Sequence, residues 1–146
     1  MYLDTTVISA YFDARTIERQ RLTQQLWNER LHAFEPVISN IVLREIWDTP
    51  IVEKRAAMGH LVNPYHVLPF TNEAEALSQE YVRRGIFPEK YSTDADHVAI
   101  AVVHGVIFFS SWNYKHLVKI ATRREINLLN ALWGYGPIEI VTPPEL

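Results

Sequence analysis

The sequence predicts an α/β protein in which a mostly parallel sheet is covered by helices on both faces. Short apolar segments alternate along the chain with longer segments whose apolar residues recur at helical spacing. Residues 106–109 are apolar without alternation, which is typical of an interior strand buried on both sides. The 146 residues are 48% hydrophobic, and no linker divides them, so we expect one domain over residues 1–146.

The predicted strands are short, as expected for a parallel sheet whose strands are connected through helices. They are residues 2–3, 36–39, 66–68, 106–110 and 138–141.

The first two predicted helices cover residues 5–13 and 16–34, the second with Leu22, Leu26 and Leu31 as its apolar stripe. The remaining helix boundaries come from capping residues and from Gly and Pro. We predict helices over residues 41–47 with Asn40 as N-cap, from Thr49-Pro50 to Gly59, from Asn72 (in a capping box with Glu75) to Arg84 before Gly85, from Thr93 to His104 before Gly105, and over 113–121.

Composition excludes several classes of protein. The formal charge is −3, so the chain is not a polyanion binder held by bulk positive charge, and a nucleic-acid role needs local basic patches or metal ions. The absence of cysteine excludes disulfides, thiolate zinc sites, iron–sulfur clusters and a cysteine nucleophile. Neither a targeting signal nor a membrane span stands out, so we expect a soluble cytoplasmic protein with no membrane partner.

Four polar residues are expected at one edge of the sheet, because functional groups collect at the carboxyl ends of parallel strands. Asp4 follows the first strand, Glu45 lies on the helix after the second, and Asn113 follows the fourth. Asp94 begins a helix of about 18 Å that leads back into a strand of about 17 Å, which should return it to the neighbourhood of Asn113.

Carboxylates a few ångströms apart raise one another's pKa and destabilise a fold, and a divalent cation removes that conflict. Hard cations such as Mg²⁺ and Mn²⁺ prefer oxygen ligands and can activate a water and polarise a phosphoryl group. The pattern therefore favours a metal-dependent phosphodiesterase whose metal supplies the positive charge that the chain lacks.

Each residue also has an ordinary structural interpretation. Asp4, Asp94 and Asn113 are all suited to helix N-termini, and Glu45 could be a surface acid paired with Arg44. Asp96 could be the ligand in place of Asp94, although on a helix it should point elsewhere.

Neighbouring residues leave further alternatives. The Asp94-x-x-His97 spacing occurs in di-iron bundles, but those need a second such motif, so we expect His97 to be a packed residue or one that supports a ligand from behind. Trp112 could stack on a base, although burial is expected. The basic residues after Asn113 suit either a solvated face or RNA-backbone contacts, and they are Lys115, His116, Lys119, Arg123 and Arg124.

Four motifs together resemble the PIN domain family, most closely the VapC-type toxins of type II toxin–antitoxin systems. They are Leu3-Asp4-Thr5-Thr6-Val7-Ile8-Ser9, Val42-Leu43-Arg44-Glu45-Ile46, Asp94-Ala95-Asp96-His97-Val98-Ala99-Ile100-Ala101 and Ser111-Trp112-Asn113-Tyr114-Lys115-His116-Leu117. The resemblance runs almost end to end and closes with residues 140–146.

This resemblance implies a three-layer α/β/α sandwich and a Mg²⁺- or Mn²⁺-dependent ribonuclease acting as a toxin. By position, Asp4, Glu45 and Asp94 would be the metal ligands, and Asn113 matches a fourth site that many members fill with Asp. Thr5 and Thr6 stand where a small polar residue often supports the first acid. The implied partners are an RNA substrate, a cognate antitoxin and a second copy in a homodimer.

Two other functions remain open. Asn113 lowers the charge of the site by one, so the chain could be a catalytically weak or inactive PIN-like domain that binds protein or RNA. A sequence-specific DNA binder is a third possibility, but no recognition helix with clustered Arg, Asn and Gln is present.

Overall fold

The computed structural model describes residues 1–146 and contains one five-stranded sheet. The strand order is β3-β2-β1-β4-β5, and every neighbouring pair is parallel, as the alternation of strands and helices predicts. The strands are β1 (Tyr2–Leu3), β2 (Val37–Ser39), β3 (His66–Leu68), β4 (Phe108–Ser110) and β5 (Glu139–Val141). The first strand of the chain therefore lies at the centre of the sheet, with Tyr2 opposite both Val37 and Phe109.

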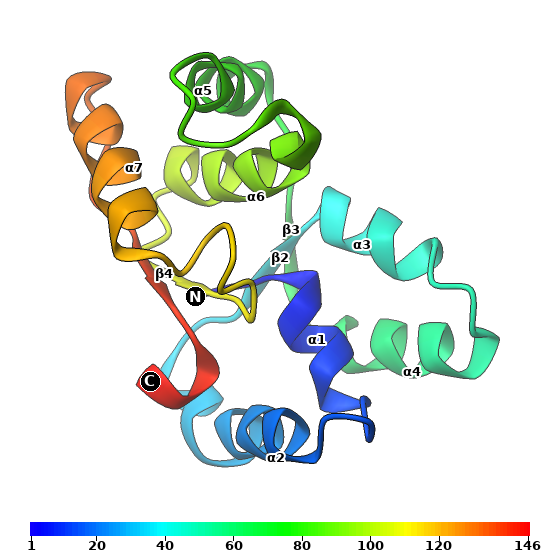
Figure 1. Cartoon of the computed structure of the whole chain (residues 1–146). Helices are drawn as coiled ribbons and strands as arrows, with labels where there is room; N and C mark the ends of the chain where they lie inside the picture. Colours follow the sequence, from blue (N-terminus) through cyan, green and yellow to red (C-terminus); the bar gives the residue numbers. More distant parts are fainter.

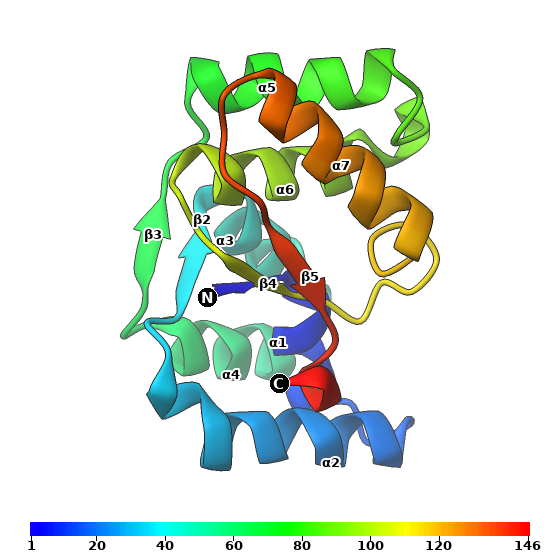
Figure 2. The same cartoon turned by 90° about the vertical axis from the view of Figure 1, so that its left-hand side faces the viewer.

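Helices cover both faces of the sheet in a three-layer α/β/α sandwich. Figure 2 shows α5, α6 and α7 on one side of the strands and α1, α2 and α4 on the other. The helices are α1 (Thr5–Tyr11), α2 (Ile17–Gln25), α3 (Asn40–Trp47), α4 (Val52–Val62), α5 (Asn72–Arg83), α6 (Ser92–Val103) and α7 (Ile120–Leu132). Figure 1 shows α1 leaving the centre of the sheet directly after the N-terminal strand.

The core consists of a main cluster of 28 buried residues that spans the sheet and the inner helices, and a smaller cluster of Val7, Ala10, Leu26 and Trp112. Tyr2 and Leu3 are fully buried, and the Tyr2 ring stacks on Phe109 with centroids 4.8 Å apart. In α6, all residues from Val98 to Ala101 are fully buried and belong to the main cluster. No helix has the length and apolar character needed to cross a membrane.

Two predicted caps are wrong by one residue. Asn40 and Asn72 are each the first residue of their helix, and the N-caps are Ser39 and Thr71. Both caps have extended backbone, and their hydroxyls accept hydrogen bonds from the N–H groups of Val42 and Ala74. Ser39 is also the last residue of β2, so this strand runs directly into its helix, whereas two residues separate the end of β3 at Leu68 from Thr71.

Other helix boundaries also differ from the prediction. The expected helix over 16–34 is α only to Gln25, and continues as a π-helical turn (Leu26–Arg30) and a 3₁₀ turn (Leu31–Ala33). The helix expected after Thr49-Pro50 begins at Val52, and the one expected at Thr93 begins at Ser92. Short 3₁₀ turns at Glu89–Tyr91 and Pro143–Glu145 were not predicted.

The largest error concerns the segment after β4. Residues 113–119 form turns rather than a helix, and the helix begins at Ile120 and runs to Leu132. The Asn113 carbonyl accepts from the N–H groups of Leu117 and Val118, and Leu117 is fully buried. This chain reversal anchors Asn113 next to the sheet edge.

The predicted interior position of the fourth strand is correct, but its burial is only partial. Phe109 is fully buried, while Ile107 is 60% exposed and lies outside the strand. The predicted ends of two helices are confirmed: Gly85 and Gly105 follow α5 and α6 with φ of 74° and 69°, a conformation that side chains disfavour.

Candidate metal centre

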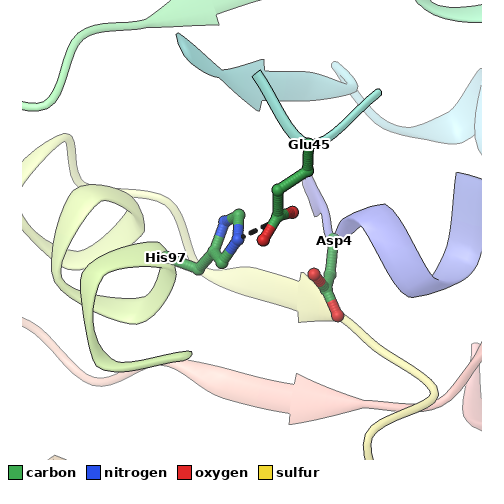
Figure 3. A group of neighbouring side chains, drawn as sticks. All are labelled: Asp4, Glu45 and His97. Atoms are coloured by element: carbon green, nitrogen blue, oxygen red, sulfur yellow. Dashed lines mark hydrogen bonds and ion pairs between the residues drawn. The ribbon is translucent and has the colours of Figure 1, made fainter. Parts of the chain in front are cut away.

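Three side chains meet beyond the carboxyl ends of the central strands. Asp4 directly follows β1, Glu45 lies in α3 after β2, and His97 lies in α6. One ligand atom from each of these residues lies within 4.8 Å of the other two (Figure 3). The topology explains the meeting, because β1 and β2 are adjacent and parallel and so end at the same edge of the sheet.

Asp94 lines the same cavity, which has a volume of about 380 Å³. Its walls come mainly from α1, α3 and α6, and they include Thr5, Thr6, Ser9, Asp13 and Arg19. The structure thus brings Asp4, Glu45 and Asp94 into one cavity, as their positions after the parallel strands and at the start of the returning helix predict. Asn113 does not line this cavity.

Two hydroxyl groups fix the Asp4 carboxylate. Thr6 Oγ1 and Ser111 Oγ each donate to Asp4 Oδ2 at 2.6 Å. Asp4 occupies the N-cap position of α1, but its side chain accepts no capping hydrogen bond. Its carboxylate is therefore oriented toward the cavity by side chains from two segments, rather than used to cap the helix.

Glu45 is held from two sides. The Thr5 hydroxyl donates to Glu45 Oε2, and His97 Nε2 lies 3.2 Å from the same oxygen. Burial opposes ionisation of this carboxyl, but the hydrogen bonds and the charge of His97 outweigh it, so the pKa of Glu45 is lowered. Glu45 is consequently a cavity carboxylate, and the predicted alternative of a surface acid paired with Arg44 is wrong.

His97 connects the cavity to the sheet. Its side chain is 3% exposed, and Nδ1 lies 2.6 Å from the Tyr2 hydroxyl, which lies 2.7 Å from Ser39 Oγ. Burial disfavours the imidazolium, but the bond to Glu45 and the charges of Asp4 and Asp94 outweigh it and raise the pKa of His97. His97 is thus both packed and in contact with a candidate ligand, as expected, and its own ring nitrogen also belongs to the group of possible ligand atoms, which was not predicted.

Asp94 is the acid of the cavity whose ionisation is disfavoured by its surroundings. Burial, followed by the charge of Asp4, raises its pKa to about 6. Asn113 Nδ2 donates to Asp94 Oδ2 at 3.0 Å. A carboxyl whose pKa is raised by burial and by a neighbouring carboxylate is poised to gain from a cation.

Asn113 acts on the cavity through Asp94. Its Oδ1 accepts from the His116 N–H at 3.1 Å, and its own N–H donates to Ser111 Oγ at 3.0 Å. Asn113 therefore caps the turn that follows it, not the last helix; its main-chain N–H donates to Ser111, and its side-chain Nδ2 donates to Asp94.

Asp96 points away from the cavity, as its position on the helix predicts. Ser78 Oγ donates to Asp96 Oδ1 at 2.5 Å, and the Asp96 side chain lines a different hollow between α5 and α6. Between the two acids of α6, only Asp94 faces the candidate site.

Two further alternatives are decided by contacts. Trp112 is only 6% exposed, and its Nε1 donates to Thr23 Oγ1 at 2.8 Å, so it is buried as expected. In the basic segment, Lys115 and Lys119 are exposed, whereas Arg123 lies 3.5 Å from Glu145. Arg123 is therefore engaged in an ion pair near the end of the chain, while the two lysines face solvent.

No family model and no curated protein matches the sequence. The fold, however, matches a chain of a toxin–antitoxin complex from Klebsiella pneumoniae with a TM-score of 0.64, at 16% identity, covering 97% of this chain and 96% of the other. It also matches a chain of VapBC2 from Rickettsia felis, bound to a promoter DNA fragment, with a TM-score of 0.58, at 12% identity, covering 96% and 97%. The fold is PIN-like. At these identities the likeness concerns the PIN-like fold, and the chemistry depends on the residues of the cavity itself.

Proposed function

We propose that the chain is a metal-dependent endoribonuclease that acts as the toxin of a toxin–antitoxin pair. The observation that carries the proposal is the meeting of Asp4, Glu45 and Asp94 in one cavity, with the pKa of Asp94 raised to about 6. Three buried or half-buried acids from three separate segments are costly to hold together without a cation.

The three carboxylates fit a hard divalent cation, because Mg²⁺ and Mn²⁺ prefer oxygen ligands. Asp4, Glu45 and Asp94 would hold it, and Asn113 would orient Asp94 through the bond at 3.0 Å. Such an ion, when bound, polarises a phosphoryl oxygen and lowers the pKa of a water.

The chain's own residues preorganise this arrangement. Thr6 and Ser111 both donate to one oxygen of Asp4, which leaves the second oxygen for a ligand role. Thr5 and His97 fix Glu45 in the same way. The resemblance to PIN-domain ribonucleases implies in-line attack of water with the 3′ oxygen as leaving group, which would leave 5′-phosphate and 3′-hydroxyl ends.

The toxin role is supported by the structural neighbours, which are chains of toxin–antitoxin complexes. A cognate antitoxin would inhibit the nuclease by covering the cavity, with an apolar helix packed beside it and a basic side chain directed at the carboxylates. We propose that the protein works in the cytoplasm, where RNA is accessible, and that it pairs as a homodimer.

The test is cleavage of single-stranded RNA in Mg²⁺ or Mn²⁺, with Asp4→Asn as the site variant and Asp96→Asn as the matched control. Cleavage by the wild type and by Asp96→Asn, with loss in Asp4→Asn, is the expected result. Equal cleavage by all three proteins would refute the assignment of the site.

Calorimetric titration with Mn²⁺ separates the nuclease from the alternative of an inactive binding module. The nuclease requires Mn²⁺ binding that Asp4→Asn weakens. RNA binding without any metal binding at millimolar Mn²⁺ would favour the module.

A further inference from the structure

The candidate metal cavity contains one basic side chain that the proposed chemistry leaves unused. Arg19, in the first turns of α2, is the only Lys or Arg among the ten residues that line the cavity. Four acids line it as well, Asp4, Asp13, Glu45 and Asp94. An arginine among carboxylates is expected to pair with one of them.

Arg19 makes no such pair. No carboxylate oxygen lies within 4.0 Å of its guanidinium. The Asp13 carboxylate, which also lines the cavity, accepts instead from the Arg15 guanidinium, at 2.8 and 2.9 Å. Instead, the Arg19 guanidinium lies over the Trp112 ring, 5.3 Å from its centroid. Stacking on a ring leaves the N–H groups around the edge of the guanidinium free to donate.

The ring under Arg19 is itself fixed. Trp112 Nε1 donates to Thr23 Oγ1 at 2.8 Å, and Thr23 in turn donates to the Arg19 carbonyl at 2.7 Å. The Trp112 main-chain N–H donates to Thr6 Oγ1 at 3.0 Å.

The same Thr6 hydroxyl holds Asp4, at 2.6 Å from Oδ2. Arg19 and Asp4 are therefore placed relative to one another through Trp112 and Thr6, even though they do not touch. This linkage sets a free guanidinium at the wall of a cavity whose other charged side chains are acids and His97.

We propose that Arg19 is a substrate-positioning residue that binds an RNA phosphate next to the one that is cleaved. This inference rests on the proposed nuclease function. A planar guanidinium binds phosphate oxygens with two parallel N–H bonds, and it is more weakly hydrated than an ammonium group. In a chain of net charge −3, this contact offsets the repulsion between the acidic cavity and the RNA backbone.

The test measures binding of a fluorescent single-stranded RNA oligonucleotide by anisotropy, in Ca²⁺ in place of Mg²⁺ to suppress cleavage, between about 50 and 200 mM KCl. The variants are Arg19→Ala, Arg19→Lys and the matched control Arg21→Ala. Arg21 lies on the same helix and pairs with Glu18 at 2.8 Å, outside the cavity. Mn²⁺ affinity and melting temperature are measured for each variant.

We expect Arg19→Ala to weaken RNA binding about tenfold and to reduce the slope of log K against log salt by about 0.7, the value for one phosphate contact on a single strand. Arg19→Lys should keep the salt slope but not the full affinity, because the lysine ammonium group cannot form the two parallel N–H bonds of a guanidinium. Arg21→Ala should match the wild type, and all variants should bind Mn²⁺ equally.

Three results would overturn the inference in distinguishable ways. If the wild type cleaves RNA and Arg19→Ala binds it as Arg21→Ala does, Arg19 does not contact the substrate, and the proposed function stands. If the wild type neither binds nor cleaves RNA, the proposed function fails and the inference fails with it. Loss of Mn²⁺ binding in Arg19→Ala would show that Arg19 supports the carboxylates instead of the RNA.

Discussion

His97 Nε2 lies 3.2 Å from Glu45 Oε2, although the two residues are 52 positions apart in the sequence. The other ring nitrogen lies 2.6 Å from the Tyr2 hydroxyl, so the imidazole connects a cavity carboxylate to the central strand. An imidazole held at both nitrogens has a fixed ring orientation, and such partners orient metal ligands in proteins. This contact makes the position of Glu45 depend on a residue of the sheet.

Tyr2→Phe is expected to weaken Mn²⁺ binding about tenfold while leaving all three carboxylates in place. The variant loses the hydroxyl that lies 2.6 Å from His97 and 2.7 Å from Ser39, so the imidazole and Glu45 become less ordered. We also expect a loss of about 1–2 kcal/mol in the free energy of unfolding, because two buried polar groups lose a partner. Calorimetry and chemical denaturation measure the two effects. Tyr11→Phe, outside the cavity, is the control, and equal Mn²⁺ affinity in both variants would contradict the role of His97.

Asp94→Asn is expected to stabilise the metal-free protein and to abolish its metal-dependent activity. Burial and the charge of Asp4 raise the pKa of Asp94 to about 6, so at pH 7.5 its ionised form destabilises the fold. Asparagine removes that charge and can still accept the bond from Asn113, which gives a gain of about 1–2 kcal/mol. The measurement is denaturant unfolding in EDTA. A variant less stable than the wild type under these conditions would contradict the charge conflict on which the metal site is argued.

Thr6→Val is expected to reduce cleavage at least tenfold, whereas Thr6→Ser should retain most of it. The Thr6 hydroxyl donates to Asp4 Oδ2 at 2.6 Å and accepts from the Trp112 N–H at 3.0 Å. Valine keeps the shape but removes both bonds, while serine keeps the hydroxyl. RNA cleavage at saturating Mn²⁺ is the measurement, and activity of Thr6→Val equal to that of Thr6→Ser would show that Asp4 needs no such support.

Glu80 gives a pH dependence of stability that is separate from the cavity. Its side chain, 10% exposed, bonds Arg83 at 2.6 Å and Arg84 at 2.7 Å, and these bonds lower its pKa to about 2. The stabilisation from the ionised group is complete above the unfolded pKa of about 4.5, and it is lost as the pH falls from there toward 2. The stability difference between wild type and Glu80→Gln should therefore be constant above pH 5 and shrink below it in thermal unfolding. A difference that grows toward pH 3 would contradict the assignment.

The fold could be predicted largely because hydrophobic periodicity is local. The apolar strands, the helices between them, and the glycines at 85 and 105 each follow from a short window of sequence. The segment after β4 could not, because residues 113–119 are held in turns by the Asn113 main chain and by burial of Leu117. Tertiary packing overrides local helix preference there.

The candidate site, too, was predictable only in part. The carboxyl ends of the parallel strands placed Asp4 and Glu45 at one edge, the length of the helix that Asp94 begins returned Asp94 to it, and the helical rotation between Asp94 and Asp96 separated those two acids. The three-residue step from Asp94 to His97 puts both on one face of α6, and this was the available signal that His97 reaches the cavity.

The sequence by itself determined the layer architecture and the glycine-terminated ends of α5 and α6, because each depends on residues near one another in the chain. Only the tertiary structure decided that His97 contacts Glu45, that Asn113 acts through Asp94, and that Arg19 stays unpaired over Trp112. Those contacts join residues that are 52, 19 and 93 positions apart, and their distances depend on how the helices pack on the sheet.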